Sequence, residues 1–336
     1  MGRVGWRGDG TGEMIDTAIL AALREAGLVG DAEPVIAALS GGVSCDVWTL
    51  TTPGCTIIVK RALPKLRVAA DWFAPVARAA TEVCWLRRAR SIDARLAPAV
   101  LAELPGNAFA LEFIANAPVW KDELVAGHVD VAFAAAVGRD LVRLHAATAG
   151  NAADAAAFAA NAQFAALRID PFIRHVAAGD PGVAAPLTAI ADRLAATHIA
   201  LVHGDISPKN ILASAAGPVF IDAECAVYGD PAFDLAFCTV HLLLKAVWRR
   251  DAAMTVAATA LLAAYRAGID WEPQGALLGR AGALTAALLL ARIDGKSPAP
   301  YLTDAGDQAA VRTRARSLLH VPQRLDMLIA GWPAHP

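Results

Sequence analysis

The fold is decided by residues 201–236, LVHGDISPKN ILASAAGPVF IDAECAVYGD PAFDLA. An apolar run leads into Asp205, and Asn210 follows five residues later. Two short apolar runs come next, separated by a Gly-Pro step, and Asp222 stands directly after the second run. This pattern predicts a β-hairpin. The hairpin should bring Asp205, Asn210 and Asp222 to the same end.

Two carboxylates and a carboxamide at one loop mouth are suited to phosphoryl transfer. Mg²⁺ prefers hard oxygen ligands and takes few of them from protein, and Asp222 and Asn210 can supply these. A separate carboxylate must face the incoming hydroxyl, orient it and accept its proton, which is the role we assign to Asp205. A hairpin with ordinary acidic turn residues is the alternative interpretation.

The loop resembles the catalytic and metal-binding loops of the protein-kinase-like superfamily, in its aminoglycoside phosphotransferase and choline kinase branch, with Gly204 where protein kinases usually have Arg. The resemblance implies ATP and Mg²⁺ as cofactors. It implies Asp205 as a catalytic residue and Asn210 and Asp222 as metal ligands. Lys209, four residues after Asp205, is a second catalytic candidate, as a cation near the transferred phosphate.

Short β-type runs between residues 35 and 61 carry candidates for nucleotide binding. Ser40, Gly41 and Gly42 lie in a turn between two of these runs, where glycine lets backbone N–H groups approach phosphates. An ordinary hairpin turn explains the same residues equally well. Lys60 ends a later run, and a Gly-rich turn followed by a lysine-bearing strand is the order found over a nucleotide. We therefore expect Lys60 to hold the α- and β-phosphates, with an exposed edge lysine as the alternative.

A helix expected over residues 74–90 should present Glu82 toward Lys60 as an ion-pair partner. The alternative is a surface glutamate among neighbouring arginines. The last strand of this part ends near Glu112. In the kinase-like fold this point is the hinge, so the resemblance implies that backbone groups near Glu112 and Ile114 meet the adenine edge.

The segment around Lys60 is also similar to 5-methylthioribose kinases. In that family a metal-binding Asp is followed two residues later by a Glu, as Asp222 is by Glu224 here, which implies that Glu224 also serves the metal. Asn210 departs from that family and is closer to the aminoglycoside and choline kinases. The residues that carry the similarity before the hinge are Lys60, Pro64, Arg67, Trp72, Arg78 and Glu82.

We predict a two-lobed, protein-kinase-like α+β fold. Residues 1–114 should form a small antiparallel-sheet lobe that binds the nucleotide, with one helix bearing Glu82. Residues 115–336 should form a larger, mainly helical lobe with the catalytic loop, the metal loop and the substrate pocket. Helices are expected over residues 13–28, 74–90, 129–147, 186–196 and 230–244 and from 254 onward, and 151–166 is expected to be a mobile helix or loop near the substrate.

Several further polar residues receive supporting roles. Asp234 should cap the helix it begins, and the resemblance implies that it also braces the catalytic loop through backbone N–H groups. We interpret His203 as an organiser of that loop and His145 as a packed or capping histidine. Arg292 and Lys296, in a polar interruption between C-terminal helices, lie either near the substrate or in a solvated loop.

Composition restricts the class of protein. A net charge of −2 argues against a nucleic-acid-binding surface. Five cysteines without a C-x-x-C pair indicate a reducing cytoplasm and no zinc site. The longest apolar helical candidates, 252–265 and 281–291, are too short to span a membrane, and the N-terminus lacks a signal peptide. We expect a soluble, cytoplasmic protein, monomeric or homodimeric, with no nucleic-acid or membrane partner.

The acceptor is expected to be the hydroxyl of a small molecule. From Asn116 onward the chain has 20 Asp and Glu against 18 Lys and Arg, which favours a neutral sugar-like alcohol over a polycation. The expected class of acceptor is a sugar-like or amino-alcohol metabolite, methylthioribose among them. Only eleven residues separate Asp222 from Asp234, which leaves little room to dock a protein substrate. The rival interpretations are an aminoglycoside-resistance kinase and a non-catalytic nucleotide-binding module.

Overall fold

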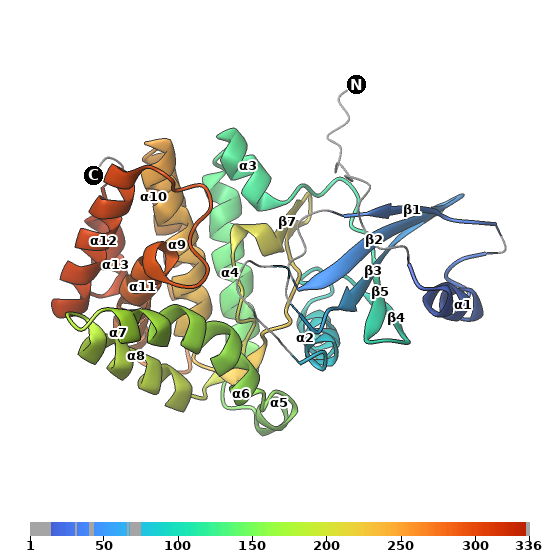
Figure 1. Ribbon diagram of the computed structural model, residues 1–336, viewed down its shortest axis with the longest axis horizontal. Helices are drawn as coiled ribbons and strands as arrows, with labels where there is room; N and C mark the ends of the chain where they lie inside the picture. Colours follow the sequence, from blue (N-terminus) through green and yellow to red (C-terminus); the bar gives the residue numbers. More distant parts are fainter. Residues whose placement is uncertain (1–14, 31, 40–43, 66, 68–74, 334–336) are drawn as a thin grey trace. The chain divides into compact units, whose positions relative to one another are not determined.

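The computed structural model describes residues 15–30, 32–39, 44–65, 67 and 75–333 (Figure 1). The chain divides into two compact units, Met1–Ala115 and Asn116–Pro336. The division falls one residue beyond the expected boundary at residue 114. The first unit is built on an antiparallel sheet and the second is mainly helical, which confirms the predicted two-lobed α+β fold.

The first unit contains a five-stranded antiparallel sheet in the order β1-β2-β3-β5-β4. In the register, Lys60 on the central strand β3 lies between Val47 of β2 and Phe109 of β5. Strand β4 was not predicted, because its alternating Val-Leu-Ala-Glu-Leu sequence follows a proline and stays half exposed. The strands are β1 Val35–Ala38, β2 Cys45–Thr52, β3 Cys55–Ala62, β4 Val100–Leu104 and β5 Ala108–Glu112.

Two helices accompany the sheet. Helix α1, Thr17–Glu25, begins after Asp16, whose carboxylate accepts the N–H of Ala18 at 2.9 Å. Its buried residues Ile19 and Leu23 belong to one apolar core with side chains of β2 and β3, so α1 covers the sheet as expected. Helix α2, Arg78–Ile92, carries Glu82 on its buried side.

The second unit contains the helices predicted from apolar periodicity, with shifted ends. Helix α3 was not predicted, because seven residues are too few to show a period. The helices are α3 Trp120–Ala126, α4 Val131–Thr148, α5 Ala152–Ala157, α6 Asn161–Phe164, α7 His175–Gly179, α8 Ala184–Ala196, α9 Ala232–Arg249, α10 Ala253–Arg266, α11 Gln274–Asp294, α12 Ala305–His320 and α13 Leu325–Ala330.

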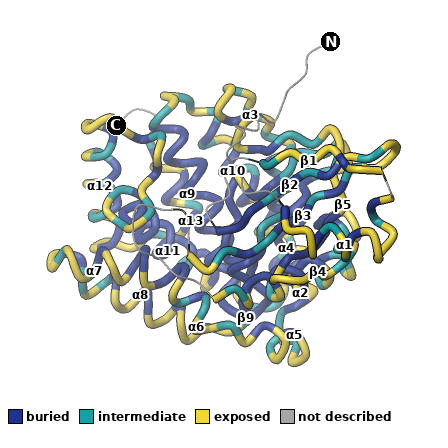
Figure 2. Tube along the Cα trace, turned by 45° about the vertical axis from the view of Figure 1, so that its right-hand side comes forward, coloured by how far each residue is buried: buried dark blue, intermediate teal, exposed yellow. Residues whose placement is uncertain are grey.

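Helix α9 forms the centre of this unit. Its residues are buried from Ala232 to Val247, and it packs against α10 and α11 (Figure 2). A helix that is apolar on every side belongs in a core. The polar side chains that α9 does carry are therefore forced into the interior of the unit.

Helix α11 corrects the expectation that no helix reaches membrane-spanning length. It has 21 residues, because the helix continues on both sides of the predicted 281–291. By length and composition it is able to cross a membrane, yet 78% of its apolar window is buried within the unit. This burial is typical of a core helix.

The strands at residues 200–229 form two small antiparallel pairs. Strand β6, Ala200–Val202, pairs with β9, Val227–Gly229, and β7, Ile211–Ser214, pairs with β8, Gly217–Phe220. The N–H of Ile221 donates to the carbonyl of Asn210 at 3.0 Å, so Asn210 and Asp222 lie at the same end of the β7–β8 hairpin. The predicted hairpin is confirmed. A 3₁₀ turn, η2 Pro208–Asn210, leads into it.

The Ala-rich segment 151–166 is not a loop. It forms α5 and α6 and continues into a π-helix, η1 Ala165–Arg174, with Pro171 inside it. Proline removes one backbone donor, and the wider π turn accommodates this loss. Segments of π-helix are often found at functional sites, and η1 carries the buried Arg168.

Candidate active site

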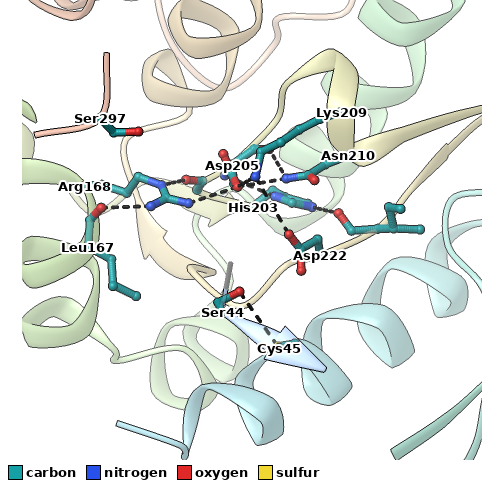
Figure 3. Close-up of polar contacts among 12 residues, drawn as sticks. Ser44, Cys45, Leu167, Arg168, His203, Asp205, Lys209, Asn210, Asp222 and Ser297 are labelled. Carbon is teal, nitrogen blue, oxygen red and sulfur yellow. Dashed lines mark hydrogen bonds and ion pairs between the residues drawn. The ribbon is translucent and has the colours of Figure 1, made fainter. Parts of the chain in front are cut away.

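Asp205 is fixed by three donors on one of its two carboxylate oxygens (Figure 3). Its Oδ2 accepts from Asn210 Nδ2 at 2.8 Å, Lys209 Nζ at 2.9 Å and Arg168 Nη2 at 3.0 Å. Oδ1 receives no hydrogen bond from the described residues of this unit. The carboxylate is therefore held rigidly through one oxygen while the other is left for a further partner.

The charges around Asp205 keep it ionised. Burial by itself would raise the pKa of Asp205, but the nearby cations Arg168 and Lys209 outweigh this effect, so the pKa lies below its ordinary value. In turn Asp205 raises the pKa of Lys209 above its ordinary value, against the effect of burial. At neutral pH the loop thus carries a permanent carboxylate with two cations beside it.

The backbone of the loop is shaped at Gly204, whose φ is +78°. A Cβ there would lie 2.4 Å from the carbonyl oxygen of Cys225, so only glycine fits. Asp234 accepts the N–H groups of His203 and Gly204 at 2.7 and 2.9 Å. The predicted brace is thereby confirmed.

The predicted capping role of Asp234 is wrong. Helix α9 begins at Ala232, and the carboxylate that accepts the Ala232 N–H, at 3.0 Å, belongs to Asp230. Asp234 lies inside the first turn of the helix, and its side chain is directed to the catalytic loop.

His203 and His145 both have structural roles, as predicted. His203 is fully buried; its Nε2 lies 3.1 Å from the carbonyl of Ile221, and its Nδ1 accepts the N–H of Asp205 at 3.2 Å. Burial lowers the pKa of His203, which suits the neutral ring that these two partners require. His145 contacts the hydroxyl of Tyr265 at 2.7 Å from its Nδ1.

The proposed metal ligands offer oxygen atoms that fit a hard cation. Asn210 Nδ2 donates to the carbonyl and the carboxylate of Asp205. Asn210 Oδ1 receives no hydrogen bond from the described residues. Asp222 has a φ of +68°, and its carboxylate lies 4.0 Å from Lys209 Nζ. Glu224 is buried and contributes to the negative field at Arg168.

No group of three or more His, Cys, Asp or Glu able to hold a metal by themselves exists in the described part of the chain. This is compatible with Mg²⁺, which takes few protein ligands and completes its shell with water and phosphate oxygens.

Arg168 was missed by sequence reasoning. From η1 its Nε donates to the carbonyl of Gly204 at 2.6 Å, while its Nη2 reaches Asp205. Its pKa is raised by Asp205 and other acidic neighbours, although burial opposes this. Nothing in the local sequence links an arginine to a loop 37 residues further on, and only the proline inside an apolar helix marked the segment as unusual.

In the first unit, Lys60 and Glu82 form the expected ion pair. Lys60 Nζ lies 2.7 and 2.8 Å from the two carboxylate oxygens of Glu82, and both residues are buried. The pair joins the central strand β3 to helix α2. A lysine held in this way points a buried ammonium in a fixed direction, as a phosphate-binding lysine must.

The other residues predicted for nucleotide binding have mixed outcomes. Ser40, Gly41 and Gly42 lie outside the described residues. Glu112 is exposed, and its side chain accepts the N–H of Ala99 at 3.0 Å. The backbone groups of Ile114 make no hydrogen bond with the described residues, so they remain available for the adenine contact predicted there.

The residues behind the methylthioribose kinase similarity have structural contacts where they are described. Arg67 pairs with Asp46 on β2, and Arg78 Nη2 donates to the carbonyls of Ser44, at 2.5 Å, and Leu63. Trp72 lies outside the described residues. These contacts shape the turn after β3 and do not bear on the acceptor.

Arg292 and Lys296 differ in their surroundings. Arg292, at the end of α11, is 8% exposed, and its electrostatic neighbours include Asp205 and Arg168. Lys296 is exposed. Of the two alternatives, Arg292 therefore belongs to the interior near the catalytic loop, and Lys296 belongs to a solvated loop.

An antiparallel sheet unit with a buried Lys–Glu pair, joined to a helical unit with an Asp-x4-Asn loop, defines a kinase-like phosphotransferase. The chain belongs to the phosphotransferase enzyme family (APH), whose sequence profile matches residues 35–277. The predicted superfamily and enzyme class, a kinase with an alcohol acceptor, are confirmed. No curated protein matches the sequence significantly.

Solved structures of low sequence identity share the fold. A choline/ethanolamine kinase family protein from Mesorhizobium loti is 19% identical, covers 92% of this chain and 96% of its own, and has a TM-score of 0.58. An amicoumacin kinase in complex with AMP-PNP, Ca²⁺ and its ligand is 14% identical, with 94% and 95% coverage and a TM-score of 0.57. Choline kinase from Cryptosporidium parvum is 11% identical, with 94% and 100% coverage and a TM-score of 0.58.

Proposed function

We propose that this protein transfers the γ-phosphate of Mg²⁺-ATP to a hydroxyl of a small metabolite, with Asp205 as the residue that orients and deprotonates that hydroxyl. One observation carries the proposal: three donors hold Oδ2 of Asp205, and Oδ1 has no partner among the described residues. A low pKa makes Asp205 a weak base. Phosphoryl transfer needs mainly a fixed acceptor for the hydroxyl hydrogen, so a weak base suffices.

The remaining roles follow from the chemistry of each side chain. Mg²⁺-ATP supplies an activated phosphoryl group whose charge the metal partly neutralises. Lys60, held by Glu82, binds the α- and β-phosphates, and the backbone at Glu112 and Ile114 meets the adenine. Ser40, Gly41 and Gly42 cover the phosphates. The amicoumacin kinase, whose structure contains AMP-PNP and Ca²⁺, supports the use of ATP with a divalent cation.

Asp222 and Asn210, with Glu224, hold the metal, and Lys209 places a second cation beside the transferred phosphate. We assign the protein to the cytoplasm, because its family acts on ATP and three of its five cysteines are buried free thiols. The choline, ethanolamine and amicoumacin kinases that share the fold support a small alcohol as the acceptor, and a sugar-like or amino-alcohol metabolite is the class expected from the sequence.

The test is ATP consumption by the purified chain with Mg²⁺ over a panel of methylthioribose, simple sugars and sugar acids, choline, homoserine and aminoglycosides. With the acceptor found, Asp205→Asn should lower kcat by a factor on the order of 10²–10⁴ and leave the Kd for Mg²⁺-ATP within about twofold. Asp192→Asn, an exposed aspartate on α8, is the matched control and should retain full activity.

Equal loss of ATP binding and turnover in Asp205→Asn would show that Asp205 is structural. Tight Mg²⁺-ATP binding without turnover of any acceptor would favour the non-catalytic nucleotide-binding module.

A further inference from the structure

Three basic side chains are buried together in the helical unit. His241 and Lys245 lie one turn apart on α9, and Arg292 lies at the end of α11. Lys245 is 1% exposed, and the other two are 8% exposed. We call these residues the cationic cluster. Within the described residues, no carboxylate forms an ion pair with any of the three.

The polar atoms of the cluster are only partly satisfied by the protein. The Lys245 ammonium lies 4.5 Å from the centre of the Tyr301 ring and has no hydrogen-bond acceptor among the described residues. Arg292 Nη1 donates to the carbonyl of Ser297 and, at 3.0 Å, to its Oγ, but among the described residues neither Arg292 Nε nor the buried hydroxyl of Tyr301 has a partner. Buried polar groups are nearly always paired, so the two buried unpaired donors beside the Lys245 ammonium, Arg292 Nε and the Tyr301 hydroxyl, indicate a missing acceptor.

Electrostatics show that the cluster is unfavourable as it stands. Burial, Arg292 and Lys121, in decreasing order of effect, together lower the pKa of Lys245 to about 8. Burial, Arg292 and Lys245 all lower the pKa of His241. Like charges in a protein interior oppose one another and lose hydration. A bound anion would offset this cost.

The cluster is connected to the catalytic loop through contacts along α9. The Arg168 guanidinium, which holds Asp205, lies 5.9 Å from the centre of the Phe237 ring, and Phe237 is 5.2 Å from the ring of His241. Lys245 comes one turn later on the same helix face. Phe237 and Lys245 are eight residues apart, which at 1.5 Å per residue is about 12 Å along the helix axis.

We propose that the phosphate acceptor is an alcohol that carries an anionic group, a carboxylate or a phosphate ester, and that Lys245, Arg292 and the Tyr301 hydroxyl bind this group. The inference rests on the proposed function, because it places the reacting hydroxyl at Asp205. The anionic group then lies at the cluster, which the Arg168–Phe237 and Phe237–His241 contacts connect to the catalytic loop. Two cations and a hydroxyl donor complement a carboxylate or phosphate and repel choline-like and aminoglycoside-like acceptors.

The first experiment measures anion binding without catalysis. The melting temperature of the wild-type chain at pH 7 is recorded with increasing inorganic phosphate at constant ionic strength. Phosphate should raise the melting temperature until binding saturates. This increase should disappear in Lys245→Met and Arg292→Met. It should persist in Arg292→Lys, which keeps the charge, and in Arg193→Met, which removes an exposed cation on α8. Lys60→Met should also retain it, because that lysine belongs to the nucleotide site.

The second experiment compares acceptors that share one carbon skeleton and differ in charge: glucose, gluconate, glucose 6-phosphate and glucosamine. Gluconate and glucose 6-phosphate separate the carboxylate from the phosphate ester. Gluconate or glucose 6-phosphate should have a higher kcat/KM than glucose. Glucosamine should have the lowest kcat/KM of the four. In Lys245→Met, KM for the anion should rise at least tenfold, while KM for ATP stays unchanged.

The two hypotheses can fail separately. A neutral or cationic acceptor whose KM does not respond to Lys245→Met would refute the anionic acceptor and leave the kinase standing. If Lys245→Met raises the KM for ATP and leaves the KM for the acceptor unchanged, the cluster belongs to the nucleotide site, which also refutes the anionic acceptor. Saturable, Lys245-dependent phosphate binding without phosphorylation of any alcohol would support the anion site and contradict the proposed function. Absence of Lys245-dependent binding would refute the anion site.

Discussion

Replacing Lys245 by methionine should make the ligand-free protein more stable. Methionine has a similar volume and no charge, so the substitution keeps the packing of α9 and removes a buried ammonium. Lys245 has a pKa of about 8 in the folded protein, against an ordinary value of 10.5. Each pH unit of difference corresponds to about 1.4 kcal/mol, so at pH 7 the folded state carries a cost of about 3 kcal/mol.

Part of that cost is already offset by the Tyr301 ring, whose cation–π contact contributes about 1–2 kcal/mol and is lost in the variant. The expected net gain is about 1–2 kcal/mol in the free energy of unfolding, which corresponds to about 2–4 °C in melting temperature. Urea and thermal denaturation at pH 7, without ligands, measure this gain. Arg193→Met, which removes an exposed cation, should change stability by no more than about 0.5 kcal/mol.

The pH dependence provides an internal check. Because the folded pKa of Lys245 lies below the unfolded value, the unfolded state binds more protons between about pH 8 and 10.5. Wild-type stability from this group therefore rises with pH over that window, and the advantage of Lys245→Met should shrink toward zero near pH 10. A variant less stable than wild type at pH 7 would refute the reasoning, because it would show that the ammonium has a stabilising partner. A gain independent of pH would refute it too.

Three further predictions concern the same unit. With an anionic acceptor, kcat/KM should fall about tenfold per pH unit above roughly pH 8, as Lys245 loses its proton in the free enzyme; a profile from pH 6 to 10 that stays flat contradicts this. Arg168→Lys cannot hold both Asp205 and the Gly204 carbonyl, so kcat should fall by about 10–100-fold with the Kd for Mg²⁺-ATP unchanged, which steady-state kinetics and calorimetry together test. Gly204→Ala combines a left-handed φ of +78° with a 2.4 Å approach to the Cys225 carbonyl and should lose about 3 kcal/mol of stability; denaturation with less than about 1 kcal/mol of loss would show that the loop adapts.

Local sequence was sufficient for the catalytic loop and for the sheet unit. The spacing of Asp205, Asn210 and Asp222 around a Gly-Pro turn specifies a hairpin, because turn residues and short apolar runs act over a few residues. The order of a β-strand with Lys60 and a helix with Glu82 also predicted their ion pair. Helix α3 was not predicted because it is too short to show a period, and strand β4 was not predicted because it is short and half exposed.

Tertiary structure alone decided which distant side chains meet the loop. Arg168 is 37 residues from Asp205 in sequence, and their contact arises from the way the π-helix packs beside the loop. In the sequence His241 and Lys245 are two basic residues in a mostly apolar helix. They become a cationic cluster because α9 is buried on every side and the end of α11 brings Arg292 to them.

The charge balance shows the same division between sequence and structure. The helical unit has nearly equal numbers of acidic and basic residues, and from this count we expected an uncharged acceptor. A count cannot separate charges that pair in water from charges held in the interior. In the folded unit Asp205 is neutralised by its neighbours, whereas Lys245 and Arg292 form no ion pair with a carboxylate among the described residues. Desolvation makes these few buried charges outweigh the many exposed ones, so the proposal of an anionic acceptor rests on the tertiary structure.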